Sequence, residues 1–212
     1  NDEPASVLLE RIKKERDRLV KEGKIRKQKP LPGITDEEKP FEIPESWEWV
    51  RLGDVALLNM GQSPSGDKVN DKEGMEFHQG KIYFSDKYLN KSNKYTTAPK
   101  KIAQPGDVLL SVRAPVGAIN ITDRKVCIGR GLCAISSLGT MPNDYYFYFI
   151  KAFEEYLVEN ATGTTFSAVT ASTVNEMKLP LPPVEEQERI VKKLDAIMNM
   201  LDELESQLSD SK

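Results

Sequence analysis

The sequence has few of the residues that bind metals or act as nucleophiles, with one histidine and two cysteines among 212 residues. Cys127 and Cys133 lie six residues apart in an apolar stretch and form no CxxC pair, and His78 alone cannot complete a zinc site. Two thiols without a disulfide framework indicate a reducing compartment. We therefore expect a cytoplasmic protein that binds no metal.

Long hydrophobic runs are also missing, since no stretch approaches the ~18 apolar residues that a membrane span requires. The chain is 39% hydrophobic, 30% charged and 8% aromatic, which is enough apolar material for a core. These values predict a soluble chain with one main domain and no membrane segment.

Catalytic motifs are weak throughout the sequence. His78 lies in a charged context and no GxSxG motif accompanies it. Gly129-Arg130-Gly131 lacks the third glycine of a dinucleotide loop, and the acid-x-lysine triplet at 176–178 is expected by chance in so charged a chain. We expect no catalytic residue here, with a stand-alone nuclease as the less favoured alternative.

Charge is unevenly distributed, although the formal net charge is only −3. Residues 11–29 hold ten basic side chains against three acidic ones, and residues 81–130 hold the same numbers. Residues 184–212 hold eight acids against four bases. The sequence therefore has a basic middle and an acidic C-terminal end.

Apolar spacing predicts a helix over residues 5–22, which Gly23 ends. Prolines in residues 29–40 favour an extended linker, and a domain boundary is expected near Phe41. A helix through Tyr146 and Leu157, capped by Asn143 or Asp144, is expected in the domain core. Short apolar runs separated by turn residues predict strands at residues 49–52, 81–84, 107–112, 117–121, 126–128 and 132–135.

The last segment has apolar residues at spacings of four and three, which is typical of a coiled-coil seam. Its charge is opposite to that of the first helix, and opposite charges favour helix pairing within or between chains. The residues expected at the pairing interface are Leu8, Ile12, Leu19, Ile190, Leu194, Ile197, Leu201, Leu204 and Leu208.

Several side chains suit contact with nucleic acid. Arginine matches the two acceptors of guanine or a phosphate bidentately, lysine neutralises phosphates, and polar or tyrosine side chains in loops can reach base edges or the backbone. A solvated surface and internal ion pairs remain the alternatives. The residues selected as DNA-binding candidates are Gln62, Ser63, Lys81, Tyr83, Arg113, Arg130, Thr164 and Thr165.

Six motifs in one order resemble the second half of the DNA specificity subunit of type I restriction-modification enzymes. PExWxW and PLPPxxEQ bracket the domain, and the resemblance covers nearly the whole chain. The matching stretches are LLERIKKER (8–16) with KEGK (21–24), PESWEWVRLGD (44–54), GQSPS (61–65), PGDVLLSVR (105–113), GL (131–132) with TGTT (162–165), and LPLPPVEEQERIV (179–191).

The resemblance implies an α+β target recognition domain that reads one half of a bipartite double-stranded DNA site, flanked by long helices that form an antiparallel coiled coil. The implied division is a conserved N-terminal helix at 1–28, a linker at 29–40, the recognition domain at 41–183 and a coiled-coil helix at 184–212. The family usually carries two recognition domains. This chain is therefore expected to be a fragment, or a half-subunit that self-associates through its helices.

The resemblance also implies a non-catalytic subunit that docks methylation subunits and works with a motor/nuclease subunit. S-adenosylmethionine, ATP and magnesium are then expected on those partners, with no cofactor on this chain. The principal alternative is a protein-protein adaptor whose coiled coil is the functional surface and whose basic face is incidental.

Overall fold

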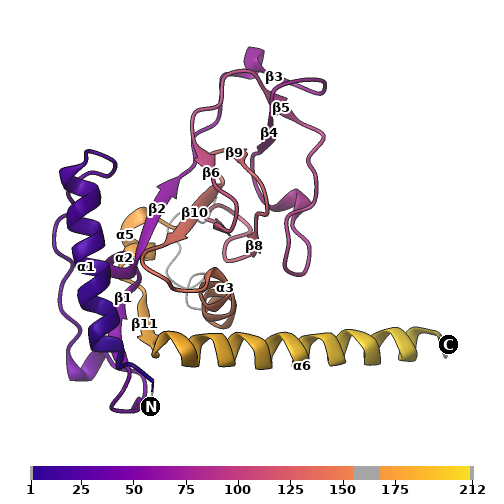
Figure 1. Ribbon diagram of the computed structural model, residues 1–212. Helices are drawn as coiled ribbons and strands as arrows, with labels where there is room; N and C mark the ends of the chain where they lie inside the picture. The colour runs from indigo at the N-terminus through magenta and orange to yellow at the C-terminus, as the bar shows by residue number, and fades with distance from the viewer. Residues whose placement is uncertain (1, 155–167, 211–212) are drawn as a thin grey trace.

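A computed structural model describes residues 2–154 and 168–210 and has the expected mixed α+β architecture (Figure 1). Long helices lie near both ends of the described chain, and most of the short strands lie between them. In order, the elements are α1 (Ala5–Lys21), η1 (Asp36–Glu38), β1 (Glu48–Arg51), α2 (Leu52–Val55), β2 (Ala56–Met60), η2 (Gly66–Lys68), β3 (Val69–Asn70), β4 (Met75–His78), η3 (Lys81–Tyr83), β5 (Tyr95–Thr96), β6 (Ile102–Ala103), β7 (Val108–Ser111), β8 (Ile119–Ile121), β9 (Val126–Ile128), β10 (Leu132–Ser137), α3 (Asn143–Ala152), α5 (Ala171–Glu176), β11 (Lys178–Leu181) and α6 (Val184–Asp210).

Helix α1 forms where the sequence predicts it and ends before Gly23, whose φ of 68° suits glycine. Its stripe of Leu8 and Ile12 is buried in the main core, and Leu19 packs against the same core. The expectation that Leu8 and Ile12 face a partner helix is therefore wrong within this chain, because the domain's own core covers them.

A four-stranded antiparallel sheet, ordered β2-β10-β7-β8, forms the centre of the domain. Because side chains alternate between the faces of a strand, the apolar run Val108-Leu109-Leu110 supplies both faces of β7. Val108 and Leu110 belong to the main core with α1 and α3, whereas Leu109 belongs to a second core with Ile128. The sheet is therefore buried on both sides.

The second sheet has the order β3-β5-β4-β9-β6 and lies at the end of the domain away from α1 and α6 (Figure 1). Its β4 and β9 strands are parallel, and the other pairs are antiparallel. The predicted strand over residues 81–84 is wrong. That segment is the 3-10 turn η3, in which Phe84 N–H donates to the Lys81 carbonyl and Ile82 is 82% exposed.

Strand β11 pairs with β1 in a two-stranded sheet, and the sequence did not predict β11 as a strand. Pro180 is tolerated because β11 has a single partner strand. Arg51 of β1 is buried and binds the linker, with bonds to the carbonyls of Pro32 and Gly33 and an ion pair to Glu38.

Helix α3 covers the main core with Tyr146, Phe149 and Ile150, as predicted. Its N-cap is Pro142 rather than Asn143 or Asp144, and Leu157 lies outside the described residues. Helix α6 starts beside the domain, where Trp47 Nε1 donates to Glu186, and then extends away from it (Figure 1).

Across residues 2–154 and 168–210, each helix is too short or too polar to cross a membrane.

A nearly buried carboxylate, Glu76 on β4, holds together segments that are distant in sequence. Arg124 binds it bidentately at 2.7 and 2.8 Å, and Ser92 N–H and His78 Nε2 each lie 2.8 Å from Oε1. Burial alone would raise the pKa of Glu76, but these hydrogen bonds outweigh it and lower the pKa to about 2.

Replacing Glu76 should therefore reduce stability in a pH-dependent way. A carboxylate with a depressed pKa contributes stability fully above about pH 4.5 and loses it as the pH falls toward about 2. We expect Glu76→Gln to cost about 2–3 kcal/mol at pH 7 and the difference to vanish near pH 2. Urea unfolding at several pH values measures it, with exposed Glu73→Gln as the control. A pH-independent cost would contradict this assignment.

Candidate nucleic-acid interface

Four strands bring their ends to one edge of the domain. In the register of the central sheet Leu132 lies opposite Ser111 and Cys133 opposite Met60, so β10 begins where β7 and β2 end. The end of β4 joins them, because the Gly129 N–H donates to the His78 carbonyl at 2.8 Å. The loops that follow these strands therefore lie side by side.

Three cations from different loops line a hollow of about 420 Å³ at this edge. Lys81 follows β4, Arg113 follows β7, and Arg130 precedes β10. All three are exposed, and their side chains have no ion pair with any residue that the structure describes. No aspartate or glutamate lines the hollow within the described ranges, so it attracts anions.

Hydrogen bonds hold the loops in place. Ser111 is buried, and its Oγ donates to the carbonyls of Arg113 (3.1 Å) and Pro115 (2.9 Å), which shapes the loop that carries Arg113. Ser63 Oγ donates to Gln79 Oε1 at 2.7 Å and accepts from the Arg130 N–H at 3.3 Å. The backbones of Arg113 and Arg130 are therefore held in place by hydrogen bonds to the two serines.

The structure brings together five of the eight predicted DNA-binding residues. Gln62 and Ser63 follow β2, and the Gln62 N–H donates to the Ile128 carbonyl beside the three cations. Tyr83 does not line the hollow, because its ring packs edge-on against buried His78 with centroids 5.6 Å apart. We assign Tyr83 a packing role. Thr164 and Thr165 lie outside the described residues.

Sequence reasoning missed Gln79 and the Ala114–Pro115 segment, which also line the hollow. The peptide bond between Ala114 and Pro115 is cis. Gln79 follows a strand, β4, that was not predicted. Its position next to the single histidine was the one local signal available.

A second basic hollow of about 850 Å³ lies between the loop after α1 and strand β2. Two of its cations are already engaged, because Arg16 donates to the carbonyls of Gly53 and Ala56 and Lys24 pairs with Glu22. Arg26, Lys27 and Lys101 remain exposed there.

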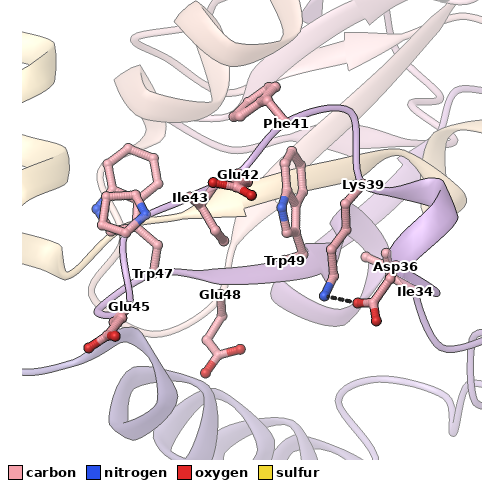
Figure 2. Close-up of a pocket in the computed structure, with 11 residues that line it drawn as sticks. Ile34, Asp36, Lys39, Phe41, Glu42, Ile43, Glu45, Trp47, Glu48 and Trp49 are labelled. Atoms are coloured by element: carbon pink, nitrogen blue, oxygen red, sulfur yellow. Dashed lines mark hydrogen bonds and ion pairs between the residues drawn. The ribbon is translucent and has the colours of Figure 1, made fainter.

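A third hollow, of about 800 Å³, is lined mainly by acidic and aromatic side chains, and we call it the acidic hollow (Figure 2). Phe41 and Trp49 pack edge to face there with ring centroids 5.0 Å apart, and Lys39 is paired with Asp36 at 2.6 Å. Carboxylates that have no ion pair among the described residues disfavour phosphate at this surface. They belong to Glu42, Glu45 and Glu48.

The groups that could support other chemistry are buried. Burial lowers the pKa of His78, whose Nε2 faces Glu76, and burial raises the pKa of the Cys133 thiol to about 12. In the part of the chain that the structure describes, no three His, Cys, Asp or Glu side chains are grouped to hold a metal ion. The hollow at the strand ends thus offers two arginines, a lysine and polar side chains, which are groups that proteins use to contact nucleic acid.

Comparison with known proteins gives the same class. The family model described as the type I restriction modification DNA specificity domain matches residues 44–211. The chain therefore belongs to the family of type I restriction-modification DNA specificity domains.

Individual relatives agree. The chain is 32% identical to the type I restriction enzyme EcoAI specificity subunit of Escherichia coli, over 98% of this chain and 37% of that protein. Its structure is similar to the crystal structure of the HsdS subunit from Thermoanaerobacter tengcongensis, with a TM-score of 0.71 and 38% sequence identity. The match covers 79% of this chain and 41% of that chain. A chain from a structural study of complex assembly and conformational transition of the type I R-M system has 34% sequence identity and a TM-score of 0.74. That match covers 97% of this chain and 52% of the other. The chain thus spans about two fifths of the first two relatives.

Glycine is required where the loops of the interface touch. A Cβ on Gly61 would lie 2.1 Å from the Gly129 carbonyl oxygen and 2.8 Å from that of Leu132, whereas a Cβ on Gly66 would meet nothing within 4 Å. We expect Gly61→Ala to lower the free energy of unfolding by about 1–3 kcal/mol, because backbone must move. Gly66→Ala, in the same loop, should change it by less than about 0.5 kcal/mol. Equal values in urea unfolding would show that the loops do not meet as described.

Proposed function

We propose that this chain reads one half of a bipartite double-stranded DNA site as part of a type I restriction-modification specificity subunit. The observation that carries the proposal is the meeting of Lys81, Arg113 and Arg130, unpaired among the described residues, at one hollow without carboxylates. Membership in the DNA specificity family and the likeness to solved HsdS chains support it.

The loop groups have different tasks in this proposal. Arg113 and Arg130 present planar forks that match the O6 and N7 acceptors of guanine, and their loops are held by Ser111 and Ser63. Lys81 neutralises phosphate, which adds affinity for any sequence. Gln62 and Ser63 supply further donors and acceptors at base edges.

The chain carries out no chemistry itself in this proposal. Methylation subunits dock on it and use S-adenosylmethionine, and a motor/nuclease subunit uses ATP and magnesium. The likeness to a structure on assembly of the type I R-M system supports partner subunits of this kind. Relatives such as the EcoAI specificity subunit are bacterial, and bacterial DNA lies in the cytoplasm, which supports a cytoplasmic location.

Helix α6 is proposed to pair with another helix and hold two recognition domains apart. Its 27 residues extend about 40 Å at ~1.5 Å per residue, a little more than one turn of B-DNA. The seam changes character along the helix: Ile190 packs against the main core, whereas Ile197, Leu201 and Leu204 are 44%, 48% and 53% exposed. Those exposed apolar side chains favour a partner helix.

Removing the two arginines tests DNA recognition. In the assembled enzyme, Arg113→Ala with Arg130→Ala should cost about 1–3 kcal/mol per arginine that reads a base and should relax sequence preference. Arg26→Ala with Lys27→Ala removes the same charge from the second basic hollow and should at most weaken all sequences alike. Selection from a random duplex library measures both.

Two results would contradict the proposal. One is unchanged affinity and preference in the Arg113 and Arg130 double variant. The other is wild-type binding that is insensitive to salt, because contacts to several phosphates must weaken steeply as salt rises. The second result would favour the adaptor, and DNA cleavage by the purified chain with magnesium would favour the nuclease.

The exposed seam gives a separate test. Leu201→Glu with Leu204→Glu should abolish helix pairing, because each buried leucine gains roughly 1.5–3 kcal/mol, while the domain stays folded. The expected result is recognition of one half-site and loss of the bipartite preference, read by light scattering beside DNA selection. Glu203→Gln, on the same exposed segment, is the control. Retention of the assembly state and the bipartite preference would show that this seam does not pair.

A further inference from the structure

Lys87 joins the recognition domain to the long helix. Its Nζ lies 2.6 Å from Asp144 Oδ1 on α3 and 2.6 Å from Asp195 Oδ1 on α6. Its backbone is tied to the central sheet, because the Ile121 N–H of β8 donates to the Lys87 carbonyl at 2.8 Å. One residue therefore connects β8, through its backbone, with α3 and α6, through its side chain.

The surroundings hold this side chain in one position. Lys87 Nζ lies 5.2 Å from the ring centroid of Tyr148 and 5.8 Å from that of Phe147, and the Tyr148 hydroxyl donates to Asp195. The Lys87 side chain is only 20% exposed. Burial alone would lower the pKa of Lys87, but the two carboxylates outweigh it and raise the pKa above its ordinary value. The contact is thus a charged, partly desolvated clamp, unlike a surface pair.

The clamp is placed where a small rotation has a large effect. Asp195 is in the first half of α6, and the helix continues beyond α3 to Asp210 (Figure 1). The part after Asp195 is about 22 Å long at ~1.5 Å per residue. A change of about 10° in its direction moves its end by about 4 Å, close to the ~3.4 Å rise of one base pair.

We propose that Lys87 is a positioning residue that fixes the direction in which α6 leaves the domain and thereby sets the spacer between the two half-sites. This inference rests on the proposed function, in which α6 separates two recognition domains. Lys87 contacts no base in this account; it acts through Asp195 and α6. Loss of the clamp should leave half-site reading intact and make the spacing less exact.

The experiment uses the full chain with Lys87→Met, and separately Asp195→Asn, which leaves Lys87 neutralised by Asp144 in case the first variant does not fold. Two matched controls come from the hollow that Lys87 and Asp195 also line. They are Lys151→Met on α3, whose Nζ lies 5.5 Å from the Phe147 ring centroid, and Asp202→Asn on α6. Neither control residue bridges α6 to the domain through a described ion pair.

The first readout is the direction of α6. Spin labels at Ser65→Cys and Gln207→Cys, both exposed sites, report the distance between the domain and the helix, and the native cysteines are buried. With spin-diluted protein, we expect the distance distribution to broaden by about 4 Å in Lys87→Met and Asp195→Asn and to stay narrow in the controls.

The second readout is DNA selected by the assembled enzyme from a random duplex library. Both clamp variants should recover the wild-type half-site motif with roughly tenfold weaker discrimination against spacers one base pair longer or shorter. Lys87→Arg, which keeps the charge, should restore most of it. A wild-type spacer preference and an unchanged distance distribution in both clamp variants would overturn the inference. If wild type itself selects no motif, the proposed function fails instead.

Discussion

The pairing of β7 with β10 is the constraint on which the rest of this structure depends. Both strands are buried on both faces, so their register is fixed by two cores at once. A slip of one residue would exchange the side chains of the main core with those of the second core. The same register places Arg113 beyond the end of β7 and Arg130 before the start of β10, at one edge. The position of the hollow between these arginines is thus a consequence of how the core packs.

Two groups of cations in this protein have contrasting environments. Arg51, Arg124 and Lys87 are buried or partly buried, and each is paired with a carboxylate, since an unpaired charge there would be costly. Arg113 and Arg130 are exposed and have no partner among the described residues. The first group ties the linker, the second sheet and α6 to the domain. The second group remains available for an anionic ligand.

The sequence predicted what depends on local pattern. The helix over residues 5–22, the long final helix and the continuous apolar strands β7 and β10 follow from spacing and were found. Strands of two residues, such as β3 and β6, leave no periodic signal, and their pairing is decided by distant partners. Leu8 was misassigned to a helix-pairing interface for a related reason, because its burial by the rest of the domain cannot be read from its neighbours in sequence.

Photo-cross-linking tests the central claim most directly, that the hollow at the strand ends faces DNA. Benzoyl-phenylalanine can replace Ile82, which is 82% exposed beside Lys81, and Phe41, which is 51% exposed in the acidic hollow. In the assembled enzyme bound to selected DNA, we expect cross-links from position 82 to the half-site and none from position 41. Cross-links from position 41 alone would contradict it.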